Sequence, residues 1–344
     1  MGASVLTRGG ASATRRQIPH IDYAAHPAYG GMLPPRPALG AEVEATLRRL
    51  IAEVEEEDRV RDAAFGYRYG TDTDISREVA AQGWCARQLA PARLELLRRA
   101  ASPIVEAIRA RLAEMKASGA AVGFKATQEI IGKGSHPDLW VQASKAIREA
   151  GLVAAASDYF GADHAALKSA AVMVNQPEQA WCNDVFRDGA IETPPTVGFH
   201  IDSVSLCVMK VVLYLDDVGP DQGPFGIVPS SHLWEQGSVG RVRRRAFDRS
   251  PFVSRARRQR QAFLSLPPEL QLKAEFGSDM LPGAPETQDI LRQEQVATGP
   301  GGQLNIFDPE AVHRGGHARA GERLVMLLSI AAKFWNLAAM DPAS

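Results

Sequence analysis

Apolar and polar residues follow a helical rhythm in the first part of the chain. Apolar residues recur every three or four positions in segments 43–54, 94–97 and 104–115, a spacing that predicts amphipathic helices facing a core. Ser102 is followed by Pro103, a pair that suits the first positions of a helix. We therefore expect helices in this part of the chain, with a new helix beginning at Pro103.

The later part of the chain changes to the pattern of buried strands. Segments 205–215 and 323–330 are long apolar runs with β-branched residues and without Gly or Pro, and 303–308 resembles them in composition. Three glycines lie between His313 and Arg323 and indicate a turn. The pattern places His313 and Arg323 on neighbouring strands joined by a tight connection.

A His-x-Asp pair stands just before the first of these runs. On extended backbone, residues two apart point to the same side, so His200 and Asp202 can both reach one ion. With His313 they form two histidines and a carboxylate, the facial triad typical of non-haem Fe(II) sites. Arg323 suits a bidentate grip on a carboxylate. Alone, a His-x-Asp pair is more often a surface pair, and the metal hypothesis depends on the whole set.

A longer block carries a specific resemblance. The triad residues, Arg323, the Tyr214-Leu-Asp-Asp stretch and Val228-Pro-Ser-Ser-His232 resemble the phytanoyl-CoA dioxygenase-like (PhyH) family of Fe(II)- and 2-oxoglutarate-dependent oxygenases. The resemblance covers residues 140–335. It implies a mainly β fold with flanking helices, a double-stranded β-helix of the jelly-roll or cupin-like type.

The resemblance also implies the roles of the site residues. It assigns Fe(II) to His200, Asp202 and His313, and it assigns the distal carboxylate of the cosubstrate 2-oxoglutarate to Arg323. O2 would be the oxidant, with ascorbate as an accessory reductant. Where relatives carry Lys-Pro-Gly, this chain has Gln176-Pro-Glu, so Asn175 or Gln176 is the expected second contact to the cosubstrate.

Four other polar residues near these motifs have simpler interpretations. His232 follows Pro-Ser-Ser and is expected to be a turn residue with local hydrogen bonds. Arg314 should face away from His313 on a strand. His317 and Arg319 belong to the glycine-rich turn, which leaves Arg323 as the better anchor for a carboxylate.

The implied reaction is hydroxylation of an aliphatic C–H in a small molecule, an acyl thioester or a natural product. Related halogenases leave the carboxylate position empty for a halide, whereas here Asp202 fills it. Desaturation, epoxidation or cyclisation would use the same ligands. A cupin-like metalloenzyme without 2-oxoglutarate and a non-catalytic barrel that acts as a binding protein are the remaining alternatives.

Length and composition fit one enzyme domain. The chain has 344 residues, 45% of them hydrophobic, and a net charge of −1. We expect an irregular, proline-containing arm at 1–38 and a single domain at 39–344. This domain would comprise a helical buttress at 39–160, a barrel core at 165–335 and an insert at 235–295.

The same composition argues against several partners. The near-neutral charge gives no indication of nucleic acid, and no apolar run approaches the roughly 20 residues that cross a bilayer. Three cysteines without CxxC spacing predict neither a disulfide framework nor a zinc-thiolate site, as in a cytoplasmic protein. The pattern does not predict an oligomeric state.

The insert is locally basic. Segment 241–260 contains nine arginines and one acid, Asp248. A solvated loop is the simplest interpretation. The functional alternative is capture of an anionic substrate, such as a carrier- or CoA-linked acyl group. Because the insert lies between two strands that carry metal ligands, it could also become ordered over the pocket when substrate binds.

Overall fold

The computed structural model describes residues 40–65, 70–120, 122, 124–177, 208–233, 262, 265–266, 292–316 and 318–331. Its α-helices are α1 (Ala41–Phe65), α2 (Asp74–Gln82), α3 (Pro91–Ala117), α4 (Pro137–Glu149) and α5 (Leu152–Tyr159). Its strands are β1 (Trp84–Gln88), β2 (Gln128–Ile131), β3 (Ala166–Asn175), β4 (Val208–Tyr214), β5 (Phe225–Ile227), β6 (Gln295–Ala297), β7 (Gln303–Phe307), β8 (His313–Gly315) and β9 (Arg323–Ala331). Two short 3-10 turns are η1 (Phe124–Thr127) and η2 (Ser231–Leu233).

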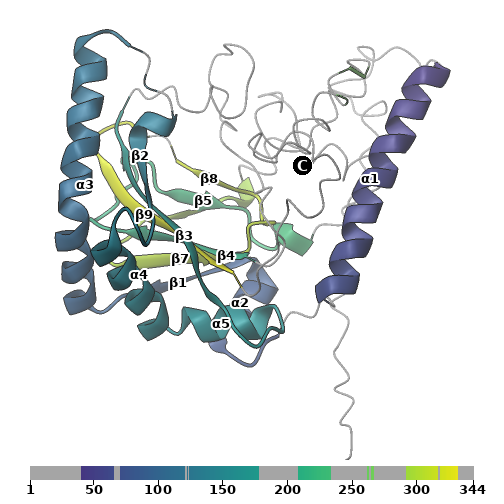
Figure 1. Cartoon of the computed structure of the whole chain (residues 1–344), viewed down its shortest axis with the longest axis horizontal. Coiled ribbons are helices and arrows are strands. Elements are labelled where there is room, and N and C mark those ends of the chain that lie inside the picture. Colours follow the sequence, from purple (N-terminus) through teal and green to yellow (C-terminus); the bar gives the residue numbers. More distant parts are fainter. Residues whose placement is uncertain are drawn as a thin grey trace, which may run out of the picture.

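The strands form two antiparallel sheets. The larger sheet has the order β1-β7-β4-β9-β3-β2, and the smaller one has the order β6-β5-β8 (Figure 1). The apolar runs predicted as strands are confirmed as β4, β7 and β9. They are central in the larger sheet, which explains why their sequences are apolar on both faces. The fold is therefore mainly antiparallel sheet with flanking helices, as expected.

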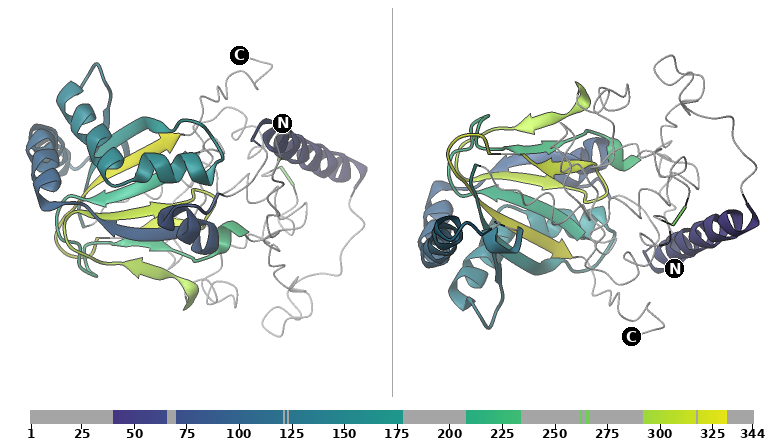
Figure 2. Two further views of the ribbon diagram at one scale, coloured as in Figure 1. Left: turned by 90° about the horizontal axis from the view of Figure 1, so that it is seen from below. Right: turned by 90° about the horizontal axis from the view of Figure 1, so that it is seen from above.

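Each face of the larger sheet has its own apolar core. Helices α3, α4 and α5 cover one side of the larger sheet (Figures 1 and 2). Val172, Val211 and Met326 belong to the core that the sheet shares with these helices. The alternate residues of the same strands point the other way. They pack with Phe225, Ile227 and other residues of the smaller sheet, so a second core lies between the two sheets.

The structure corrects the prediction of a helix start at Pro103. Helix α3 runs without interruption from Pro91 to Ala117, with Pro103 inside it. A proline there removes one helical hydrogen bond. The helix continues because buried apolar residues on both sides of the proline, among them Leu97 and Ile108, pack into the same core. Burial of this stripe outweighs the loss of one bond.

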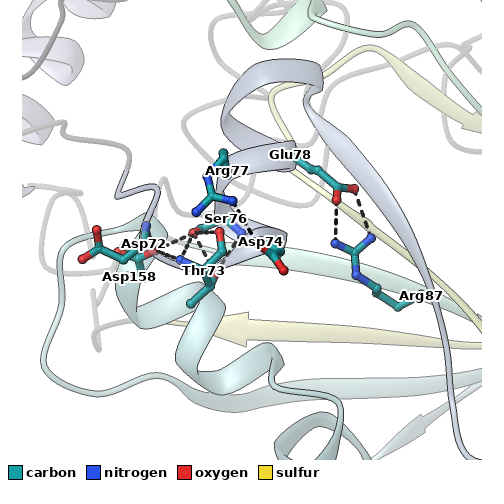
Figure 3. A network of polar contacts seen from close by, with 8 residues as sticks. All are labelled: Asp72, Thr73, Asp74, Ser76, Arg77, Glu78, Arg87 and Asp158. Atoms are coloured by element: carbon teal, nitrogen blue, oxygen red, sulfur yellow. Dashed lines mark hydrogen bonds and ion pairs between the residues drawn. The ribbon is translucent and has the colours of Figure 1, made fainter.

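The start of α2 is tied to α5 by one carboxylate. Asp158 accepts hydrogen bonds from the backbone N–H groups of Asp72 (2.9 Å) and Thr73 (3.1 Å) and from the Ser76 hydroxyl (Figure 3). Thr73 caps the helix by accepting from the Ser76 N–H (3.0 Å). At the other end Gly83 takes the left-handed conformation, with φ 79°, so that β1 begins directly after the helix.

Two short strands in the helical part of the chain were not predicted. Strand β1 pairs with β7, with Trp84 opposite Phe307, and an ion pair between Arg87 and Glu78 (2.8 Å) links it to α2 (Figure 3). Strand β2 pairs with β3 at the other edge of the larger sheet. Both strands extend the sheet beneath the helices.

The helical prediction for 43–54 is confirmed by α1, which lies apart from both sheets in Figures 1 and 2. Its buried residues Leu47 and Leu50 are not members of the core that covers the larger sheet. Among the described helices, none combines the length and the apolar character needed to cross a membrane. The predicted domain boundaries remain predictions, and the arm at 1–38 lies outside the described residues.

Candidate functional site

Two of the three predicted iron ligands, His200 and Asp202, lie outside the described residues. The triad therefore stays a prediction. Within the described ranges there is no cluster of three or more side chains suited to hold a metal, which is the expected result when only His313 of the triad is described.

His313 is the first residue of β8 and lies between the two sheets. It is 5% exposed, and its ring packs against Phe307 of the larger sheet, with 4.6 Å between ring centroids. The carbonyl of Ala311 accepts a hydrogen bond from Nδ1 at 2.8 Å. Because a carbonyl only accepts, Nδ1 carries the proton of this hydrogen bond. A bond from Nδ1 to a backbone carbonyl and a fixed ring plane are typical of a histidine that binds a metal through Nε2.

Arg323 is the first residue of β9, and its side chain enters the space between the sheets. Val325, two residues further on, belongs to the core between the sheets, so Arg323 shares its face. Asn175, at the end of β3, is its direct partner across the strands. With the Asn175 amide turned to satisfy both groups, its oxygen accepts from Arg323 Nε (3.0 Å) and Nη2. Arg323 Nη1 donates to the carbonyl of Gly223.

Among the described residues, Arg323 has no anionic partner. Its partners in the described part of the chain are the amide of Asn175 and the carbonyl of Gly223, and neither is an anion. Burial lowers the pKa of Arg323 to about 10. Three of the five guanidinium N–H groups are used by these partners. The arrangement is a buried cation, held in place by neutral groups, with donors left for a carboxylate.

Gln176 lies on the opposite side of the sheet from Arg323. Its side-chain amide donates to Glu322 (3.0 Å), which also pairs with Arg109 of α3 (2.6 Å). Residues 176 and 322 are next to the pair Asn175–Arg323 and so face the helices. Of the two residues predicted as second contacts, Asn175 is therefore the one beside the guanidinium.

The structure corrects the prediction that His313 and Arg323 lie on neighbouring strands. Strand β8 belongs to the smaller sheet, where it pairs with β5, whereas β9 belongs to the larger sheet. The chain crosses between the sheets through a turn that contains Gly321, with φ 75°. Both side chains nevertheless enter the same space, one from each sheet.

Tyr214 joins the two sheets near this space and was not predicted as a site residue. Its hydroxyl donates to the carbonyl of Ala297 (2.6 Å) and accepts from the N–H of Phe225 (2.8 Å), so a residue of β4 is bonded to β6 and β5. Burial raises the pKa of Tyr214, and the charge of Arg323 opposes that shift. The phenol therefore remains a neutral bridge that sets the spacing of the sheets.

The Val-Pro-Ser-Ser-His block has a structural role that the sequence pattern concealed. Ser231 is fully buried, and its hydroxyl donates to the carbonyl of Val228 (2.7 Å) and accepts from the N–H of Val312 (2.7 Å). The N–H of Val228 in turn bonds to the carbonyl of Val312 (2.9 Å). The residue immediately before His313 is thereby held on both sides.

His232 is not a turn residue with only local bonds. It is 9% exposed, and its Nε2 lies 3.1 Å from the carbonyl of Ala80 in α2. The buried Asp308 nearby accepts a hydrogen bond from the Tyr159 hydroxyl (2.6 Å). Burial raises the pKa of Asp308, and the charge of His232 opposes that shift. The histidine thus belongs to a polar cluster that joins α2, α5 and the β7–β8 connection.

Arg314 and Arg319 agree with their structural interpretations. Arg314 pairs with Glu294 (2.6 Å) on the outer face of the smaller sheet, away from His313. Arg319 is exposed in the turn, and His317 lies outside the described residues. None of these observations favours a ligand role for them.

Two antiparallel sheets direct His313 and Arg323 into the space between them, and within the described ranges Arg323 has only neutral hydrogen-bond partners there. A family model described as phytanoyl-CoA dioxygenase (PhyH) matches residues 31–323. The chain belongs to this family, as its motifs indicated. Membership supports Fe(II)- and 2-oxoglutarate-dependent oxygenase chemistry. A search of curated proteins found no match.

Several solved structures are similar to the chain. EctD from S. alaskensis in its apoform is 15% identical over 77% of this chain and 80% of that chain, with a TM-score of 0.43. The α-ketoglutarate-dependent carbocyclase SnoK from nogalamycin biosynthesis is 14% identical over 77% and 86%, with a TM-score of 0.41. AviO1 from Streptomyces viridochromogenes Tue57 is 15% identical over 79% and 95%, with a TM-score of 0.39. The family assignment rests on the family model and not on these likenesses.

Proposed function

We propose that the protein is an Fe(II)- and 2-oxoglutarate-dependent dioxygenase that hydroxylates an aliphatic C–H of a small-molecule or acyl-thioester substrate. Its two sheets would be the halves of a double-stranded β-helix. The observation that carries the proposal is Arg323, a buried cation between the sheets without a carboxylate partner among the described residues. An uncompensated buried charge is costly, and a dicarboxylate cosubstrate would supply the missing anion.

The donors present fit the two groups that this chemistry needs. Nε2 of His313 would be one iron ligand, with His200 and Asp202 as the others, a donor set suited to Fe(II). Arg323 would bind the distal carboxylate of 2-oxoglutarate, and Asn175 would hold the guanidinium in position. When bound, iron and 2-oxoglutarate supply the activation of O2 and the oxidising equivalents.

The chain's own contribution is orientation and exclusion of water. Met173, Val212 and Val325 are buried between the sheets on the faces that carry Asn175 and Arg323. Apolar walls lower the local dielectric constant and strengthen the attraction between the guanidinium and a carboxylate. The product is decided by which substrate carbon these walls hold near the iron. Hydroxylation is proposed because Asp202 would fill the position that a halide would need, while desaturation, epoxidation and cyclisation are outcomes of the same site.

The test is an anaerobic titration of the purified protein with Fe(II) and 2-oxoglutarate. We expect bound iron by metal analysis, a charge-transfer absorption band on adding 2-oxoglutarate, and slow succinate release in air with ascorbate. His313→Ala should lose iron. Arg323→Lys should keep iron but weaken 2-oxoglutarate binding by about 10-fold or more, because lysine cannot form the bidentate contact. Arg319→Lys is the matched control, because Arg319 is exposed in the turn that precedes β9.

Two results would replace the proposal. Iron uptake and catalysis that do not depend on 2-oxoglutarate or Arg323 would indicate a cupin-like metalloenzyme. Absence of both iron uptake and succinate would indicate a non-catalytic binding protein.

A further inference from the structure

Glu322 directly precedes the proposed cosubstrate anchor Arg323 and is bonded to two other elements on the helix face of the larger sheet. Its Oε1 accepts a hydrogen bond from Nη2 of Arg109 in α3 at 2.6 Å, and Nε of the same arginine lies 3.1 Å from Oε1. Its Oε2 accepts from the side-chain amide of Gln176 at 3.0 Å. The carboxylate therefore joins α3, the end of β3 and the start of β9.

The two strand ends that Glu322 joins are those that carry the site residues. Gln176 follows Asn175 and Glu322 precedes Arg323, and Asn175 and Arg323 are direct partners in the pairing of β3 with β9. Adjacent residues on extended backbone point to opposite faces of a sheet. From the helix face, the Glu322 carboxylate thus holds together the two backbone positions whose side chains meet between the sheets.

The backbone of Glu322 supports another partner of the guanidinium. Its carbonyl accepts from the side-chain amide of Gln222 at 3.0 Å. The next residue, Gly223, supplies the carbonyl that accepts from Nη1 of Arg323. Gly223, like Asn175, thus lies beside a residue whose side chain is bonded to Glu322.

Charge alone would not favour an acid at position 322. The proposed cosubstrate is a dianion, and a carboxylate close to its binding site weakens its binding by repulsion. The ion pair with Arg109 offsets this charge, and the Glu322 side chain is 23% exposed on the helix face. The bonds that Glu322 makes, rather than its charge, are therefore what can benefit the site.

We propose that Glu322 is a positioning residue for the cosubstrate, which fixes the strand ends that present Asn175 and Arg323 to the distal carboxylate of 2-oxoglutarate. The inference rests on the proposed function and adds to it a residue that acts on cosubstrate affinity without touching the cosubstrate. A guanidinium held in position binds a carboxylate without first losing conformational freedom. Without the bonds of Glu322, the ends of β3 and β9 would move more freely and the affinity would fall.

The experiment compares Glu322→Ala with Glu106→Ala. Glu106 also pairs with Arg109, at 2.9 Å, but it is an exposed residue of α3 itself. Each substitution removes one negative charge and one partner of Arg109, so E106A is the matched control. 2-Oxoglutarate is titrated without oxygen into full-length protein loaded with Fe(II). The charge-transfer band reports the Kd for 2-oxoglutarate, metal analysis reports the iron content, and a succinate assay reports KM and kcat.

We expect E322A to weaken 2-oxoglutarate binding by about 5-fold or more, with a parallel rise in KM. Its iron content and its kcat at saturating 2-oxoglutarate should stay within about 2-fold of the wild type, because the residue positions only the cosubstrate anchor. E106A should keep the Kd of the wild type. A general loss of structure would instead lower iron content and kcat together.

Several outcomes overturn the assignment. An unchanged or lower Kd in E322A does so, since removal of a repelling charge alone predicts tighter binding, and so does an equal weakening in E106A. Loss of iron in E322A also overturns it, because the carboxylate would then support the whole site. If E322A does not fold, Gln176→Ala decides, because it removes one of the bonds without a change of charge. A Kd raised by about 3-fold or more in Q176A then supports the assignment, and a smaller change overturns it. If the wild type binds neither iron nor 2-oxoglutarate, the proposed function fails first, and this inference fails with it.

Discussion

The Ser231 hydroxyl gives the sharpest prediction of stability. Replacing Ser231 with Ala removes a donor to the carbonyl of Val228 and the acceptor of the Val312 N–H, both at 2.7 Å in a fully buried position. Leaving a buried polar group unsatisfied costs about 1–3 kcal/mol. The Val228 carbonyl keeps a longer bond from the Ser231 N–H (3.3 Å), so most of the cost falls on Val312. We expect the free energy of unfolding to fall by about 2–3 kcal/mol.

Urea denaturation followed by circular dichroism measures this difference. Ser118→Ala is the matched control, because its hydroxyl donates to the carbonyl of Met115 at an exposed position, where water replaces the bond. Val312 directly precedes His313, so the Ser231 variant should also weaken Fe(II) binding, by about 10-fold. If S231A and S118A unfold with free energies that agree within about 0.5 kcal/mol, the two buried hydrogen bonds of Ser231 do not stabilise the fold as argued.

Three further variants test other parts of the structure. Asn175→Asp places a carboxylate beside Arg323, where it would compete with 2-oxoglutarate for the guanidinium. The KM for 2-oxoglutarate in a succinate assay should therefore rise by about 10-fold or more while stability is retained. An unchanged KM would contradict the proposal that Arg323 binds the cosubstrate. Burial raises the pKa of Asp308, so its contribution to stability is complete below the ordinary pKa of about 4 and is lost at higher pH. The unfolding free energy of the wild type relative to Asp308→Asn should therefore fall from pH 4 to 7, and a constant difference would argue against a raised pKa. Gly83→Ala should destabilise the protein more than Gly119→Ala, by at least about 1 kcal/mol in urea denaturation. Both glycines have a positive φ, but only a Cβ at Gly83 would meet another side chain, at 2.8 Å from His232 Nδ1. Equal effects of the two substitutions would show that this close contact does not matter.

The strands that the sequence pattern predicted are those at the centre of the larger sheet. Strands β4, β7 and β9 are apolar on both faces because each face meets a core, and their composition alone indicates burial. Strands β1 and β2 have short, mixed sequences at the sheet edges, with no period long enough to detect. Their pairing depends on residues far along the chain, which local pattern does not reveal.

The candidate site was named from residue types and their spacing, and its ligand roles stay predictions. Arg323 and Asn175 were both named as cosubstrate contacts, and the register adds that they lie side by side. The buried bonds of Ser231 were not predicted, because they depend on how the loop after β5 packs against the residue before β8. Those are properties of the assembled sheets, and the spacing of His313 and Arg323 likewise does not show that the chain changes sheets between them.

The change of sheet between β8 and β9 has a mechanical consequence. A molecule held at one end by the His313 imidazole and at the other by the Arg323 guanidinium would link the two sheets. Otherwise the sheets are joined by side-chain contacts and by a few hydrogen bonds, such as those of the Tyr214 hydroxyl. The binding energy of that molecule would then oppose separation of the sheets. Loading the protein should slow amide hydrogen exchange throughout the smaller sheet, in β6 as well as in β8, which carries His313.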